Sequence, residues 1–139
     1  MCGICGVIHF DGSPVEQANL TRMVETIHHR GPDDSGVWAD SNVGLGNTRL
    51  AIIDLSPAGH QPLSNESGDV WIAFNGEIYN FQPIRDELMK RGHAFRSRTD
   101  TETIVHLFEE RGIECLQALR GMFALAIWDR RKRELWLAR

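Results

Sequence analysis

Strand-like segments at both ends of the chain constrain its fold most strongly. An apolar run covers Cys2–Phe10, and near the other end two apolar runs, Met122–Trp128 and Glu134–Ala138, flank the charged turn Asp129–Arg133. Such runs bounded by turn residues are typical of strands, and the last two predict a hairpin. Strands at the ends with helices between them predict an α+β fold. Because the second strand of the hairpin reaches the terminus, we expect a domain truncated within its sheet.

The first half of the interior alternates between predicted elements and loops. Ser13–Glu16 has the sequence of a capping box and predicts a helix that runs to about His28. A strand pair is predicted at Val37–Ala39 and Val43–Ile53. The segments on either side of that pair, 29–36 and 54–67, are rich in turn residues and predict long loops.

The second half contains one predicted strand and two predicted helices. Val70–Phe74 favours a buried strand that ends at the dipeptide Asn75-Gly76. Asn80 is a candidate cap for a helix over 81–91, which would end at Gly92. Thr99 or Asp100 is a candidate cap for a further helix ending near Gly112. Its expected buried stripe consists of Ile104, Leu107 and Phe108.

Charge and hydropathy exclude several classes of partner. The 139 residues suit one domain and carry 15 Lys and Arg against 19 Asp and Glu, with the basic residues dispersed along the chain. This pattern argues against nucleic-acid binding. No apolar run approaches the ~18 residues of a membrane-spanning helix, and the N-terminus lacks the features of a signal peptide. We therefore expect a cytoplasmic protein without a membrane or nucleic-acid partner.

Cys2 has the most specific chemistry in the sequence. Removal of an initiator Met that precedes a small side chain would leave Cys2 as the first residue, with a thiol and a free α-amine. An α-amine with a pKa of about 7.7 to 8.0 can accept the thiol proton directly or through a water, as it does for an N-terminal threonine nucleophile. Position and residue type alone equally fit a small apolar residue that begins a strand.

Cys2 and Cys5 also form a Cys-x-x-Cys pair, which admits a small metal or thiol-redox module. A structural zinc site needs four ligands, and the third cysteine, Cys115, has no second Cys or paired His beside it. A thioredoxin-type motif would begin a helix, whereas Ile4 and Val7 favour a strand. We therefore expect no metal at this pair and a buried, small Cys5.

Five further residues admit both a structural and a binding role. Asn75 and Gly76 could direct a side-chain amide and a backbone N–H at one oxyanion, or form a turn. Arg49 lies in an apolar strand, where an inward guanidinium would need a carboxylate partner and would suit a substrate carboxylate. An outward, solvated Arg49 is the alternative. Asp100 could cap a helix and Glu77 could be a surface acid, or each could bind an ammonium group.

Five ordered motifs together carry a resemblance that none of them carries alone. From Cys2 to Arg139 the sequence resembles the class II glutamine amidotransferases, and among these the glutamine-hydrolysing asparagine synthetases. The motifs are Met1–Gly6, His29–Asp33, Thr48–Asp54, Phe74–Asn80 and Arg98–Glu102. Two other segments, Gly59–Leu63 and Gly121–Ala124, also favour the asparagine synthetase branch.

The resemblance implies an N-terminal nucleophile hydrolase fold, a four-layer αββα sandwich in which two β-sheets lie between helical layers. It implies that Cys2 attacks the side-chain amide of glutamine, with Asn75 and the Gly76 N–H as the oxyanion hole. Arg49 would bind the α-carboxylate of the substrate. The other implied contacts are Glu77 and Asp100 to the α-ammonium group, and the backbone of Leu50, Ile52 and Ile53 around the pocket.

The implied activity is glutamine hydrolysis through a γ-glutamyl thioester on Cys2, which releases ammonia and glutamate without a cofactor. Family members complete this domain and add an ATP-using synthetase domain, so residues 1–139 are expected to be a partial amidotransferase domain. ATP and Mg²⁺ are expected only in the absent synthetase domain or subunit, which would receive the ammonia. Two alternatives remain: a non-catalytic remnant that binds glutamine or a partner, and a metal or redox module of Cys2 and Cys5. The sequence is compatible with an oligomer.

Overall fold

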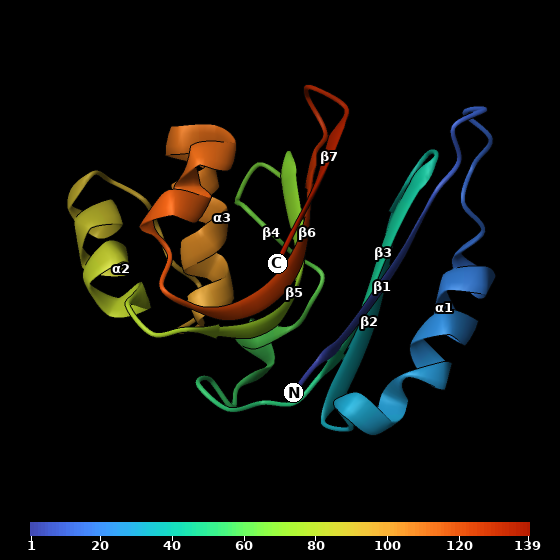
Figure 1. The fold of residues 1–139 in the computed structure, drawn as a ribbon, viewed down its shortest axis with the longest axis horizontal. Helices are drawn as coiled ribbons and strands as arrows, with labels where there is room; N and C mark the ends of the chain where they lie inside the picture. The colour runs from blue at the N-terminus through green and yellow to red at the C-terminus, as the bar shows by residue number, and fades with distance from the viewer.

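The computed structural model describes all residues 1–139 and arranges them in four layers (Figure 1). In chain order the helices and strands are β1 (Gly3–Ile8), α1 (Gln17–Thr26), β2 (Asp34–Asp40), β3 (Val43–Arg49), β4 (Leu63–Ser64), β5 (Val70–Ile78), α2 (Phe81–Lys90), α3 (Asp100–Arg111), β6 (Gly121–Asp129) and β7 (Glu134–Ala138). Short 3₁₀ turns cover His28–Arg30, Pro57–Gly59 and Gly112–Ala118. The α+β prediction is confirmed.

Two antiparallel sheets form the middle layers. One has the strand order β1-β3-β2 and the other the order β4-β5-β6-β7. Helix α1 covers the outer face of the three-stranded sheet, while α2 and α3 cover the outer face of the four-stranded sheet (Figure 1). The larger core cluster, which includes Ile72, Ile104 and Ile127, fills the space between the four-stranded sheet and its helices. A smaller cluster, which includes Leu45, Ala73 and Trp128, joins the two sheets.

The close packing of α1 depends on two glycines in β3. A Cβ atom at Gly44 would collide with Leu20, and one at Gly46 would collide with Val24. These two α1 side chains are buried directly over the sheet. Register then fixes the N-terminus, because Gly3 pairs with Thr48 at the other end of β3. Cys2 consequently lies beside the residues that follow β3.

The predicted turn at Asn75-Gly76 is wrong. Strand β5 runs through both residues to Ile78, and all nine of its residues pair with β6, from Val70 opposite Asp129 to Ile78 opposite Gly121. An Asn-Gly pair favours a tight turn locally, but pairing with β6 holds the segment extended, and the N–H groups of Phe74 and Ile78 that face away from β6 donate to Gln61 and Asp100. Asn75, Gly76 and Glu77 therefore lie in the second half of β5 and not in a loop.

Three other expectations also need correction. Helix α1 begins at Gln17, because the Ser13 hydroxyl bonds to Asp11 rather than capping the helix. Asn80 occupies the N-cap position of α2, as predicted, but its side chain makes no capping hydrogen bond; it donates to Ala118 O and accepts from Arg120 N instead. The strand predicted to reach Ile53 ends at Arg49. At Ser13 a competing hydrogen bond to a residue two positions earlier replaces the predicted cap, whereas at Asn80 a tertiary contact does so.

The C-terminal half of the chain agrees with the predictions more closely. Helix α3 begins after Thr99, whose hydroxyl accepts a hydrogen bond from Glu102 N at 3.2 Å. Its predicted stripe, Ile104, Leu107 and Phe108, is buried. Strands β6 and β7 form the expected hairpin. None of the helices has the length and apolar character needed to cross a membrane.

Candidate active site

One cavity of about 110 Å³ opens where the N-terminus, the end of β3, strand β5 and the start of α3 meet. Eight of the nine residues predicted for the site line it: Cys2, Arg49, Leu50, Ile52, Ile53, Gly76, Glu77 and Asp100. They come from four separate parts of the chain, which the two-sheet packing brings together. Asn75 is the ninth and does not line the cavity.

The Cys2 thiol is half-buried at the cavity wall. Its Sγ lies 3.4 Å from Leu50 N and 3.8 Å from Leu50 O. The carbonyl of Cys2 accepts a hydrogen bond from Arg30 Nε at 3.1 Å, and Gly3 N donates to Thr48 Oγ1 at 3.1 Å. These two contacts fix the peptide bond between Cys2 and Gly3, directly after the thiol. Met1, which precedes it, is exposed and also lines the cavity.

Of the two orientations considered for Arg49, the structure shows the inward one. Its guanidinium nevertheless has no carboxylate partner. Arg49 is only 6% exposed, and Nη1 donates to the Ser56 carbonyl at 3.0 Å while Nη2 donates to the Asp54 carbonyl. No Asp or Glu lies within ion-pair distance of its guanidinium. The carboxylate of Asp54 is near Arg49 but does not pair with it, and a buried cation whose hydrogen bonds go to neutral carbonyls favours an anionic ligand.

Asp100 supplies the opposite charge across the cavity. Its side chain is buried at the first position of α3, and Oδ2 accepts a hydrogen bond from Ile78 N at 2.9 Å. Burial raises the pKa of this carboxyl, and the nearby charge of Glu77 raises it further. No cation pairs with Asp100 in the protein, so an ammonium group in the cavity would stabilise its ionised form.

Asn75 lies on a different face of β5 from the residues that pack against α3. It is two residues after Ala73, which belongs to the cluster between the sheets, and therefore shares its face. The Oδ1 atom of Asn75 is buried without a hydrogen-bond partner. Such an atom is rare in a folded protein and often marks a functional position.

Two residues of the surrounding loop hold the site without having been predicted to do so. The buried Gln61 accepts a hydrogen bond at Oε1 from Phe74 N at 2.7 Å, which ties the loop to β5. Asp54 accepts hydrogen bonds from Arg98 N at 2.8 Å and Ser56 N at 2.9 Å, which lower its pKa to about 2. Both residues lie in motifs that carried the family resemblance, and that was their only signal in the sequence.

Cys5 takes no part in this site. Its Sγ lies beside Gly46 on the face that α1 covers, away from the contact of Cys2 with Leu50. The three cysteines form no disulfide. Burial raises the pKa of the Cys5 thiol, which disfavours the thiolate needed for metal binding or disulfide exchange. Cys5, which the sequence predicts to be buried, is only partly so.

Comparison with known proteins places the chain among amidotransferases. The model of the glutamine amidotransferase domain family matches residues 1–139. Asparagine synthetase [glutamine-hydrolyzing] 3 of Bacillus subtilis is 42% identical over 142 residues, covering 100% of this chain and 23% of that protein. Asparagine synthetase [glutamine-hydrolyzing] 2 of Arabidopsis thaliana is 41% identical over 140 residues, covering 100% and 24%. The chain thus spans about a quarter of the length of these curated relatives.

A solved structure supports the fold independently. The glutamine phosphoribosylpyrophosphate amidotransferase of B. subtilis superposes with a TM-score of 0.75 over 93% of this chain and 35% of that one, at 21% identity. At this identity the likeness establishes the fold alone. The family model, which covers every residue, settles the membership. The chain belongs to the family of class II glutamine amidotransferase domains.

Proposed function

We propose that this chain is the glutamine-hydrolysing part of an asparagine synthetase-like amidotransferase. It would release ammonia and glutamate in the cytoplasm and deliver the ammonia to a synthetase domain or subunit. The fold would then be the αββα sandwich of the N-terminal nucleophile hydrolases, with residues 1–139 as part of the amidotransferase domain. The printed names of the relatives support the choice of asparagine synthetase over other branches.

One observation carries the proposal: the same cavity is lined by a thiol, a buried cation and a buried acid, and neither Arg49 nor Asp100 forms an ion pair within the protein. Glutamine has an α-carboxylate and an α-ammonium group at one end and a carboxamide at the other. Arg49 would bind the carboxylate, and Asp100 with Glu77 would bind the ammonium. The backbone of Leu50, Ile52 and Ile53 would line the pocket. The carboxamide would then extend toward Cys2.

In the proposed reaction the Cys2 thiolate attacks the carboxamide carbon of glutamine. The oxyanion of the tetrahedral intermediate accepts hydrogen bonds from the Gly76 N–H and the Asn75 amide, each worth ~3 to 4 kcal/mol by analogy with measured oxyanion holes. The C–N bond then breaks, ammonia leaves with the proton taken from the thiol, and a γ-glutamyl thioester remains on Cys2. Water hydrolyses the thioester and releases glutamate.

Asn75 must turn its side chain toward the substrate for this role. Its buried, unpartnered Oδ1 means that the conformation seen has no hydrogen bond at that atom to lose. The α-amine of Cys2 is the proposed proton acceptor, which requires removal of Met1. Because Met1 is exposed at the cavity, its removal would also enlarge the space beside the thiol.

The experiment that tests the proposal is a glutaminase assay on the purified chain and two matched variants. Cys2→Ala should lose at least about 10⁴-fold of the activity, because the nucleophile is gone, while Cys5→Ala should retain most of it. Thermal melting of both variants verifies that they are folded. Equal activity in Cys2→Ala and the unmodified chain would refute the assignment.

Mass spectrometry of the N-terminus separates hydrolysis from binding alone. After exposure to a glutamine-like diazo-ketone, the proposal predicts a single adduct on Cys2 in protein that has lost Met1. A folded chain that retains Met1, binds glutamine and forms no adduct would instead be a non-catalytic glutamine-binding module.

A further inference from the structure

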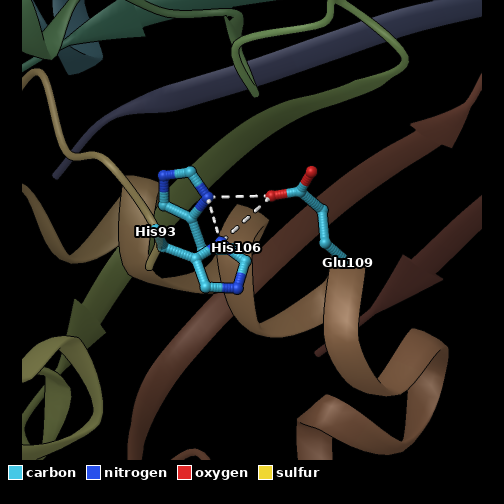
Figure 2. A group of neighbouring side chains, drawn as sticks. All are labelled: His93, His106 and Glu109. Atoms are coloured by element: carbon cyan, nitrogen blue, oxygen red, sulfur yellow. Dashed lines mark hydrogen bonds and ion pairs between the residues drawn. The ribbon is translucent and has the colours of Figure 1, made fainter. Parts of the chain in front are cut away.

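A second cluster of reactive side chains lies at the second half of α3, away from the end of the helix that lines the cavity. Figure 2 shows His93, His106 and Glu109 directed toward one another. His93 is in the loop after α2, and the other two residues are one helical turn apart in α3. His106 is six residues beyond Asp100, about 9 Å along the helix axis. The cluster is therefore distinct from the glutamine cavity, and the proposed hydrolysis does not use it.

The distances in this cluster match those between the ligands of a tetrahedral metal. Nδ1 of His93 lies 3.2 Å from Nδ1 of His106, which lies 2.8 Å from Oε2 of Glu109. The third side, from His93 Nδ1 to Glu109 Oε2, is 3.7 Å. Bonds of about 2.0 to 2.1 Å to a tetrahedral zinc ion separate its ligands by about 3.3 Å. One ion can therefore contact all three atoms with only small side-chain shifts.

The surroundings of His93 favour a metal-binding tautomer. Its Nε2 lies 3.2 Å from Glu110 Oε1, so Nε2 carries the proton and donates it to that carboxylate. Nδ1 is then left with a lone pair directed at the centre of the cluster. A carboxylate on the remote nitrogen of a histidine is the usual support for a metal ligand.

His106 contacts the cluster through Nδ1, which lies 2.8 Å from Glu109 Oε2, so without an ion Nδ1 carries the proton and donates it to that carboxylate. His106 is only 1% exposed, and its Nε2 has no hydrogen-bond partner but faces Glu102 Oε1 and Glu66 Oε1, both at 3.9 Å. An ion that displaces the Nδ1 proton leaves the Nδ1 lone pair facing inward and the remaining proton on Nε2, near these carboxylates. Nδ1 of His93 lies only 3.2 Å from Nδ1 of His106, so a single ion can take the place of the proton among the three acceptor atoms.

Glu109 completes the donor set. Its Oε1 accepts a hydrogen bond from Asn65 Nδ2 at 2.7 Å, which orients the carboxylate and leaves Oε2 toward the histidines. The side chains of His93 and Glu109 are partly exposed, 19% and 27%, so an ion can enter and a water can take a fourth position. Two imidazoles and a carboxylate are a donor set that Zn²⁺ accepts readily.

We propose that His93, His106 and Glu109 bind a divalent transition-metal ion, with Zn²⁺ the best match to the donors and distances. The ion connects the loop after α2 to the middle of α3, and through Asn65 it also engages the loop before β5. It acts as a structural clip on the helical layer that carries Asp100. A competing arrangement is a protonated His106 held by Glu102 and Glu109 without any metal.

The test is a calorimetric Zn²⁺ titration of the Cys2→Ser/Cys5→Ser chain, in which the two partly exposed thiols no longer compete for the ion. One equivalent is expected to bind, and His93→Gln and Glu109→Gln should each weaken binding at least about ten-fold. These two residues are partly exposed, so the variants avoid the folding risk of replacing the buried His106. His28→Gln and Glu25→Gln, which alter exposed residues near the end of α1, should leave the affinity unchanged.

Two further readouts make the outcome decisive. Saturating Zn²⁺ should raise the Tm of this chain by roughly 5 to 10 °C and leave that of His93→Gln unchanged. Co²⁺ should give the intense visible bands of a tetrahedral ion, which Glu109→Gln should lose. Absence of binding, or equal binding by His93→Gln, would overturn the proposal and leave the protonated His106 as the explanation.

Discussion

Asp100 and Glu102 lie two residues apart in α3 and are both buried, yet their pKa values shift in opposite directions. Burial tends to raise both. Glu102 overcomes burial because His106 is near, and because Arg96 N, Ser97 N and the Ser97 hydroxyl donate to it at 2.6 to 2.8 Å; its pKa falls to about 2. Asp100 faces the cavity and Glu77, and its pKa is raised.

The contrast distinguishes two acidic residues on the same helix: one whose charge stabilises the fold, and one whose charge is available to a ligand. Glu102 has its partners within the protein, so its ionised form contributes to stability. The ionised form of Asp100 is less well compensated, and a cationic ligand would supply what is missing. A buried acid with incomplete partners in a cavity is thus a better guide to a binding site than burial alone.

Among substitutions that test this contrast between Asp100 and Glu102, Asp100→Asn should have the largest effect on activity. The substitution keeps the shape and the acceptor for Ile78 N but removes the charge that would bind the α-ammonium group. Glutaminase kcat/KM should fall roughly 30- to 1000-fold, while the Tm stays the same or rises. A variant that is destabilised, but whose folded fraction keeps full activity, would show that Asp100 is a structural residue like Glu102.

Glu102→Gln should show the reverse pattern. Losing the charge weakens the hydrogen bonds from the 96–97 segment and the attraction to His106, so the free energy of unfolding should fall by about 3 kcal/mol. Urea denaturation at neutral pH measures this, with the exposed Glu87→Gln as a control. Activity per folded molecule should stay within a few-fold, and a selective loss of activity would argue against a purely structural role.

The pH dependence sharpens the comparison further. The pKa of Glu102 is lower in the folded chain, about 2, than its ordinary 4.5, so its stabilisation is present above pH 4.5 and is lost as the pH falls toward 2. The raised pKa of Asp100 has the opposite sign: its ionised form opposes folding at neutral pH, and this is relieved below pH 3.8. Urea denaturation across this range should therefore show the Glu102→Gln deficit and any Asp100→Asn advantage both disappearing at low pH.

The smallest effect is expected at the helix cap between these two environments. Thr99→Ala removes the hydroxyl that accepts from Glu102 N and should lower the free energy of unfolding by about 1 kcal/mol. Thr21→Ala, which removes an exposed hydroxyl in α1, should change it by less than about 0.5 kcal/mol. An equal effect of both substitutions in urea denaturation would show that the Thr99 cap is dispensable.

Much of this architecture could be predicted from local sequence. The Thr99 cap, the buried stripe of α3 and the hairpin of β6 and β7 follow from residue types a few positions apart. The strand through Asn75-Gly76 could not, because pairing with β6, more than 40 residues later in the chain, determines it.

The candidate site shows the same division. Motifs that carried the family resemblance marked Cys2, Arg49 and Asp100, but not the carbonyl partners of Arg49, since backbone carbonyls leave no trace in a sequence. His93, His106 and Glu109 were not singled out either. Only His106 and Glu109, three positions apart on a helix, offered a local signal, and the third member joins through tertiary packing.

Gly59 shows how far the specificity of such a cavity can depend on what lies behind it. A Cβ atom there would overlap the guanidinium of Arg49, so the bare backbone acts as a rear wall that sets how deep the cation sits. A larger residue at position 59 would therefore displace the Arg49 guanidinium and reshape the cavity without changing any of its charged groups.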